Sequence, residues 1–253
     1  MLNQITHGEK TDQPDLMIIH GLYGSGRNWG VISKRLSNER RVIAVDQRNH
    51  GHSPWYDQHG YTDMAEDLAE VIRANGAPMD VIGHSMGGKA AMVLALKYPE
   101  LVNRLVVADI APVSYEHTQS QYIKAMQAVD LDKVTKRSDA EEQLRTMVDD
   151  PTLPVFFTQS LDVTAKKWRL NLDILAQEMP KILSFPDVEG EFSGPVLFLS
   201  GANSQYVLPA HRALIKSLFP KASFAKIPGA GHWLHAEKPR EFEANVRAWL
   251  KQS

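Results

Sequence analysis

The sequence contains no cysteine among its 253 residues. This excludes disulfide bonds, a thiol nucleophile and a thiolate metal site. An excess of charge of one sign is also missing, because 28 Lys and Arg residues balance 30 Asp and Glu residues, for a net charge of −2. The chain therefore lacks the basic character of proteins that bind nucleic acids or anionic membranes.

Two kinds of hydrophobic segment are absent as well. No apolar run approaches the about 20 residues that a membrane-spanning helix needs. The first ten residues lack the basic and apolar regions of a secretory signal. Hydrophobic residues make up 43% of the chain and charged residues 23%, as in ordinary globular proteins. We expect a cytoplasmic protein without a membrane partner.

Short, nearly continuous apolar runs divide the chain, and such runs are typical of strands buried on both faces of a parallel sheet. Helical periodicity separates them, most clearly over residues 64–72, where Thr62 is a candidate N-cap, and the chain closes with a helix over residues 239–251. This alternation predicts a mostly parallel central sheet flanked by helices. The runs cover residues 16–19, 41–45, 79–82, 105–108, 194–200 and 223–227.

A polar stretch interrupts this alternation over residues 112–191 and contains no convincing strand. Helical patterns occur in it at residues 118–129, 140–148 and 165–175. We interpret it as a helical cap inserted over the strand ends, where open α/β sheets bind ligands. The core domain would then comprise residues 1–111 and 192–253. A separate helical domain is the alternative interpretation.

The most informative motif is G-x-S-x-G at residues 83–87, with an apolar run before it and a helical pattern after it. This pattern places a serine on a tight turn between strand and helix, with its hydroxyl exposed above the sheet. The glycines allow the strand and the helix to approach each other closely. Ser85 is therefore predicted to be a nucleophile, although the same motif also occurs as a plain turn.

A serine nucleophile needs a base within hydrogen-bonding distance. His232 follows the last predicted strand on a glycine-rich loop, from which its ring can return over the sheet to Ser85. His235 is the other nearby candidate, but it is more simply interpreted as part of the approach to the final helix. We predict that His232 is the base.

The loop after the run at residues 194–200, where the acid of such sites commonly lies, has no carboxylate. Asn203 in that loop could orient an imidazole but cannot stabilise its charged form. Asp109 ends the run at residues 105–108, next to the serine-bearing strand in the expected sheet. We therefore predict that Asp109 orients His232. A Ser-His dyad, with Asp109 as a structural residue, is the alternative.

Attack on an ester carbonyl leaves an oxyanion, which backbone N–H groups stabilise. The amide of Met86, directly after the serine, is one predicted donor, and the amide of Leu22 in the His-Gly turn after the first run is the other. The segment over residues 46–53 is interpreted as a loop that supports this turn. His50 and His52 lack further ligands at a recognised spacing, so we predict no metal site.

With these motifs in order, the chain resembles the α/β-hydrolase superfamily over nearly its whole length. Its motifs look specifically like those of the YbfF-type esterases, which carry the acid after the Asp-Ile-Ala-Pro segment and an Asn-Ser pair in the usual acid loop. The resemblance implies hydrolysis of short-chain acyl esters, with acyl-CoA thioesters as a second substrate class, and no cofactor. These motifs lie at residues 46–53, 83–88, 109–113, 168–172 and 201–204.

The predicted function is therefore that of a serine esterase with an acyl-enzyme intermediate and a small-molecule ester or thioester as its substrate. Apolar cap residues are candidates for lining the acyl pocket, although aromatic residues in such segments also form the cap's own core: Phe156, Phe157, Trp168 and Leu172. The alternative functions are a C–C bond hydrolase or another cofactor-free α/β-hydrolase enzyme, and a ligand receptor with a little-used triad. The sequence leaves the oligomeric state open.

Overall fold

The computed structural model describes residues 1–116 and 118–251. Its central feature is a seven-stranded sheet with the strand order β1-β3-β2-β4-β5-β8-β9. All neighbouring strands are parallel except β1, which pairs antiparallel with β3 at one edge. The strands are β1 (Gln4–His7), β2 (Leu16–Ile19), β3 (Val42–Val45), β4 (Met79–His84), β5 (Val102–Ala108), β8 (Val196–Gly201) and β9 (Ala222–Ile227).

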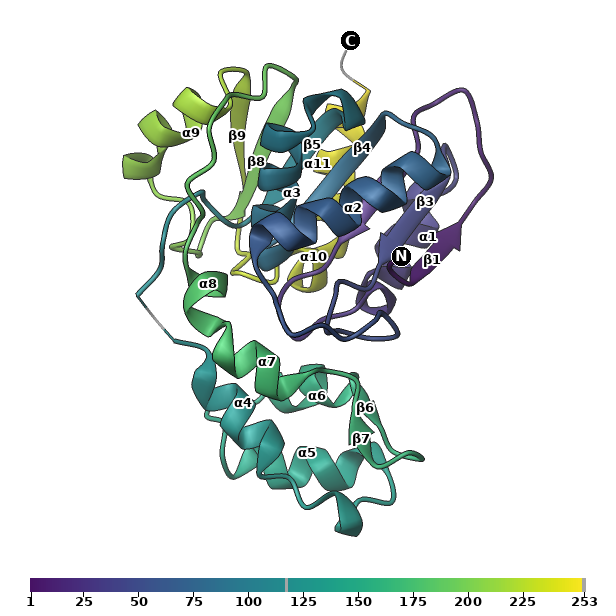
Figure 1. The fold of residues 1–253 in the computed structure, drawn as a ribbon, viewed down its shortest axis with the longest axis vertical. Helices are drawn as coiled ribbons and strands as arrows, with labels where there is room; N and C mark the ends of the chain where they lie inside the picture. The colour runs from purple at the N-terminus through teal and green to yellow at the C-terminus, as the bar shows by residue number, and fades with distance from the viewer. Residues whose placement is uncertain (117, 252–253) are drawn as a thin grey trace.

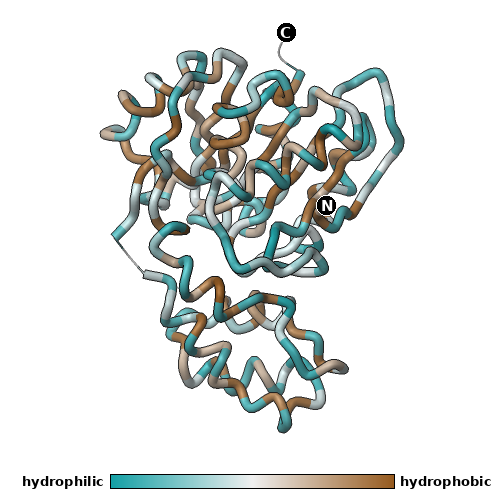
Figure 2. Tube along the Cα trace, viewed as in Figure 1, coloured by the Kyte–Doolittle hydropathy of each residue, from teal (hydrophilic) through white to brown (hydrophobic). Residues whose placement is uncertain are grey.

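Successive strand residues point to opposite faces of the sheet, so each strand supplies two hydrophobic layers. Met17 and Ile19 of β2 belong to the layer covered by α2, α3 and α9, whereas Leu16 and Ile18 belong to the layer covered by α1, α10 and α11. Figure 2 shows the resulting band of apolar residues along the strands. The helices are α1 (Gly30–Leu36), α2 (Tyr61–Asn75), α3 (Met86–Lys97), α9 (Arg212–Leu218), α10 (Leu234–Glu237) and α11 (Pro239–Leu250).

A helical unit lies between β5 and β8 in the chain and below the sheet in Figure 1. We propose that this unit is the cap and that it comprises residues 112–191. Its helices are α4 (Ser120–Gln127), α5 (Arg137–Arg145), α6 (Leu153–Thr158), α7 (Leu172–Gln177) and α8 (Met179–Leu183). Short 3₁₀ helices occur at η1 (Gly26–Trp29), η2 (Pro99–Leu101), η3 (Leu131–Lys133) and η4 (Pro209–His211).

The cap also contains a two-stranded hairpin, β6 (Leu161–Asp162) and β7 (Lys167–Trp168). The sequence predicts no convincing strand in this region and a helix over residues 165–175. The hairpin contradicts the first prediction, and the second is wrong for residues 165–171. Lys166 has a positive φ of 48° and ends the turn of the hairpin. Helix α7 can therefore begin only at Leu172, after the strand pairing has ended.

The carboxyl ends of β2, β4 and β5 lie side by side because these strands are neighbours and parallel. The three loops that leave them begin at His20, Ser85 and Asp109. This is the edge at which open α/β sheets bind ligands. Within the part of the chain that the structure describes, no helix combines the length and the hydropathy needed to cross a bilayer.

Candidate active site

Ser85 occupies a strained turn between β4 and α3, with φ 52° and ψ −123°. A positive φ is unfavourable for a residue with a side chain, so the surroundings must hold it there. The neighbouring glycines make this possible. A β-carbon at position 83 would lie 2.3 Å from the carbonyl oxygen of Gly87, and one at position 87 would lie 2.4 Å from that of His20.

His232 lies on the loop after β9 and contacts two of the other predicted residues. Its Nε2 is 3.0 Å from Ser85 Oγ, and its Nδ1 is 2.7 Å from Asp109 Oδ2. The ring stacks on Tyr206, with 4.0 Å between the ring centroids. The backbone is held as well, because His84 Nε2 donates a hydrogen bond of 2.8 Å to the carbonyl of His232.

Asp109 is fully buried directly after β5 and also has a positive φ of 52°. Its Oδ1 accepts a hydrogen bond from the amide of Gly201 at 3.1 Å, and its Oδ2 accepts one from Ser204 Oγ at 2.5 Å. Donors of this kind stabilise the ionised carboxylate. The loop after β8 thus supplies hydrogen-bond donors to an acid that the loop after β5 supplies.

The two predicted oxyanion donors line the same pocket as Ser85. Among residues 1–116 and 118–251, neither the Leu22 amide nor the Met86 amide donates to a protein acceptor. Met86 is the first residue of α3, where backbone N–H groups have no partner within the helix. Both amides are therefore available to a bound oxyanion.

The segment over residues 46–53 supports the turn after β2, as its interpretation as a structural loop implies. The Gln47 amide donates to His20 Nε2 at 2.9 Å, and the Gln47 side chain donates to the His20 carbonyl at 2.8 Å. His50 Nε2 accepts a hydrogen bond from the Tyr23 amide at 3.2 Å. Burial lowers the pKa of both histidines, so their neutral rings can act as acceptors.

The cap covers Ser85 with aromatic side chains. Phe156 and Phe157 line the pocket. Trp168 and Leu172 do not, and expecting them there was wrong. The indole of Trp168 donates to the Met126 carbonyl at 2.9 Å and is buried inside the cap, as is Leu172.

Sequence reasoning missed three residues of this region. Ser204 and Tyr206 contact Asp109 and His232 from the loop that lacks a carboxylate, so only the Asn-Ser pair could have drawn attention to it. Lys89 also lines the pocket. Its signal was a single charge within the apolar first half of α3. In the described part of the chain, no three His, Asp or Glu side chains are grouped closely enough to hold a metal ion.

This geometry can be compared with known proteins. A family model described as "alpha/beta hydrolase fold" matches residues 14–239. The chain belongs to the α/β-hydrolase family. The predicted fold class, a mostly parallel central sheet flanked by helices in an α/β-hydrolase, is therefore confirmed.

Relatives in this family agree with the predicted resemblance to YbfF-type esterases. The chain is 34% identical to the esterase YbfF of Escherichia coli, over 98% of this chain and 96% of the relative. It is 41% identical to the mouse sn-1-specific diacylglycerol lipase ABHD11, over 94% of this chain and 81% of the relative. A solved structure described as a marine microorganism esterase has a TM-score of 0.92 at 37% identity, covering 98% of both chains.

Proposed function

We propose that this protein is a serine esterase that hydrolyses short-chain carboxylic esters through an acyl-enzyme on Ser85. The observation that carries the proposal is the continuous chain of hydrogen bonds from Ser85 through His232 to Asp109. Relatives named esterase and lipase support ester hydrolysis as the activity. A cytoplasmic location remains a prediction of the sequence.

In the proposed mechanism, His232 Nε2 accepts the proton of Ser85 as Oγ attacks the acyl carbonyl. The amides of Leu22 and Met86 donate to the oxyanion, and losing one such donor typically costs about 10²–10³-fold in turnover. His232 then protonates the leaving alcohol, and a water molecule repeats the sequence on the acyl-enzyme. Asp109 accepts from Nδ1, which leaves Nε2 free as the base and stabilises the imidazolium.

The preference for short acyl groups is supported by the walls of the pocket. Phe156, Phe157, Tyr115 and Tyr122 line the pocket from the proposed cap, and Tyr61 lines it from the core. Packed rings of this size leave an acyl chain little room to extend. Thioesters with the same acyl groups remain a second substrate class, because the same attack serves both.

The test is steady-state hydrolysis of p-nitrophenyl esters from acetate to decanoate, with wild type beside Ser85→Ala. We expect turnover that falls as the chain lengthens, and a loss of about 10⁶-fold in the variant. Intact folding of the variant is checked by its circular dichroism. If both proteins are inert or equally active, the esterase proposal fails and the C–C hydrolase and receptor hypotheses take its place.

A further inference from the structure

Lys89 is a charged residue in a helix whose other early positions are small or apolar. It is 1% exposed, and the residues that follow it in α3, from Ala90 to Leu94, are buried as well. Removing an ammonium group from water without an ionic partner is energetically costly. The position of this lysine therefore calls for an explanation.

The helix directs Lys89 toward the candidate active site. It lies in the first turn of α3, and Ser85 is the N-cap of the same helix, four residues earlier. Side chains of a helix incline toward its N-terminus, which here is the end that carries Ser85. In agreement with this, Lys89 lines the same pocket as Ser85, Leu22 and Met86.

The contacts of the Lys89 ammonium group are all with uncharged groups. Nζ donates to the carbonyls of Leu183 at 2.9 Å and Ser184 at 2.6 Å, at the end of α8. It also lies 4.8 Å from the ring centroid of Tyr115 and 5.7 Å from that of Tyr61. Within the described residues, no carboxylate comes within the 4.0 Å of an ion pair. Two acceptors leave one of the three N–H groups of the ammonium for a ligand.

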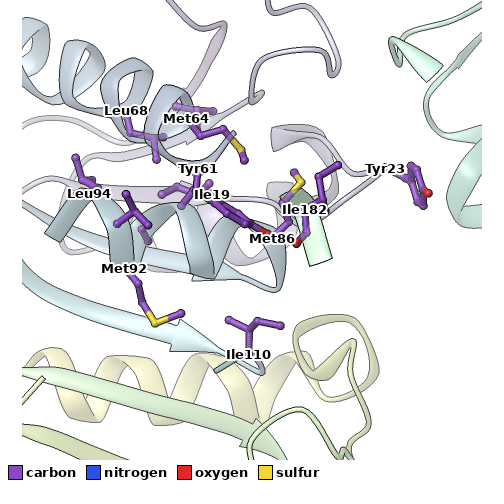
Figure 3. Close-up of a cluster of buried hydrophobic side chains, with 14 of the residues drawn as sticks. Ile19, Tyr23, Tyr61, Met64, Leu68, Met86, Met92, Leu94, Ile110 and Ile182 are labelled. Carbon is purple, nitrogen blue, oxygen red and sulfur yellow. Dashed lines mark hydrogen bonds between the residues drawn. The ribbon is translucent and has the colours of Figure 1, made fainter. Parts of the chain in front are cut away.

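The apolar surroundings of Lys89 would strengthen its interaction with a bound anion. Figure 3 shows Tyr61, Met86 and Ile182 close together near the start of α3, and all three residues also line the pocket. Burial lowers the pKa of Lys89 to about 7. A carboxylate beside the amine would raise that pKa again and hold the group in its charged form.

We propose that Lys89 binds a carboxylate at the far end of the substrate's acyl group, so that the enzyme prefers half-esters of short dicarboxylic acids to uncharged esters of equal length. This inference rests on the proposed esterase function. A short acyl group is expected because Ser85 and Lys89 lie at the same end of α3 and line the same pocket.

The test compares two p-nitrophenyl esters of the same chain length, the half-ester of glutaric acid and the uncharged valerate. The kcat/KM ratio of the two is measured for wild type, Lys89→Met and Lys89→Gln. Because the ratio is taken within each protein, a change in folding or in general activity divides out. Glutamine keeps a hydrogen-bond donor without the charge and so separates charge recognition from the capping of α8.

We expect wild type to favour the half-ester by about tenfold or more, and both variants to lose that preference. A ratio that is the same in all three proteins, or one that glutamine preserves, would overturn the role of Lys89. If neither variant folds, a wild-type preference for the valerate overturns the inference and the opposite preference supports it. Wild-type activity on neither ester would instead point to a failure of the esterase proposal itself.

Discussion

The sheet-bearing core and the helical cap meet at one pocket, but they contribute different kinds of contact to it. The core surrounds Ser85 with hydrogen-bonded polar side chains, such as Asp109, which accepts from Ser204 and His232. The cap contributes rings that pack against other rings, as Phe156 does against Trp233 and Phe157 against Tyr23. Hydrogen bonds require fixed geometry, whereas apolar packing tolerates adjustment. We infer that changes in the core alter the chemical step and that changes in the cap alter substrate selection.

The sharpest test of this comparison is Asp109→Asn. The amide cannot stabilise the imidazolium and favours the wrong tautomer of His232, so we expect kcat to fall by about 10⁴-fold. The measurement is steady-state kinetics on a short-chain ester. Asn203→Ala, in the loop where the acid of such sites commonly lies, is the matched control and should change kcat little. Equal and mild losses in both variants would remove Asp109 from the proposed triad.

A second test concerns the loss of stability at acidic pH. We expect the buried histidines of the core to account for most of this loss. His235 stacks on Trp29 with 4.0 Å between the ring centroids, and among the described residues its Nδ1 has no hydrogen-bond partner. Burial lowers its pKa to about 3. As the pH falls below about 6.5, His235 therefore takes up a proton in the unfolded protein but not in the folded protein. The free energy of unfolding decreases from that pH down to about pH 3.

We expect His235→Phe to keep the stack and remove this dependence. Between pH 7 and pH 5 the wild type should lose about 2 kcal/mol more stability than the variant, from about 1.4 kcal/mol per pH unit of the window crossed. Urea denaturation at the two pH values measures the difference. An identical loss in both proteins would show that His235 is also protonated in the folded state, or that its protonation does not affect the free energy of unfolding.

The core was predictable from the sequence because its signals are local. The six apolar runs all fall on strands. Ser85 and Asp109 directly follow strands β4 and β5, and His232 lies on the loop after β9. Parallel strands bring their carboxyl ends to one edge, so loop position alone suggested which side chains would meet. Strand β1 was not predicted, because it is a partly exposed edge strand of mixed polarity and lacks a continuous apolar run.

The cap was less predictable because its arrangement depends on contacts between distant residues. Nothing in the local pattern distinguishes Phe156, which reaches the pocket, from Trp168, which a hydrogen bond to Met126 holds inside the cap. The contacts of Lys89 likewise depend on where α8 returns to the core. The amino-acid composition of the cap indicated apolar helices. Only their packing shows which of the apolar side chains face Ser85.

A smaller effect is expected from Ser204→Ala, which tests whether the loop after β8 belongs to the machinery of the core. Without the 2.5 Å hydrogen bond, one donor to the Asp109 carboxylate is lost. Hydrogen bonds to charged groups are worth about 1.5–3 kcal/mol, so kcat should fall by about tenfold or somewhat more while KM stays near the wild-type value.

The control for this variant is Ser217→Ala, which removes a serine hydroxyl from the exposed face of α9. It should leave both kcat and KM as they are. If Ser204→Ala lowers stability but leaves kcat unchanged, the serine has a structural role and the loop after β8 does not assist the acid.

The smallest effect should come from the cap itself. Phe156 lines the pocket and is partly exposed, so Phe156→Ala removes apolar contact with the substrate without opening the sheet core. Burying part of a phenylalanine side chain contributes apolar binding free energy. We therefore expect KM for an uncharged ester to rise about fivefold, with kcat within about twofold of wild type. Val155→Ala, one residue away and 45% exposed, should change neither constant. A fall in kcat at constant KM would instead show that a cap side chain acts in the chemical step, and the division between a core that reacts and a cap that selects would no longer hold.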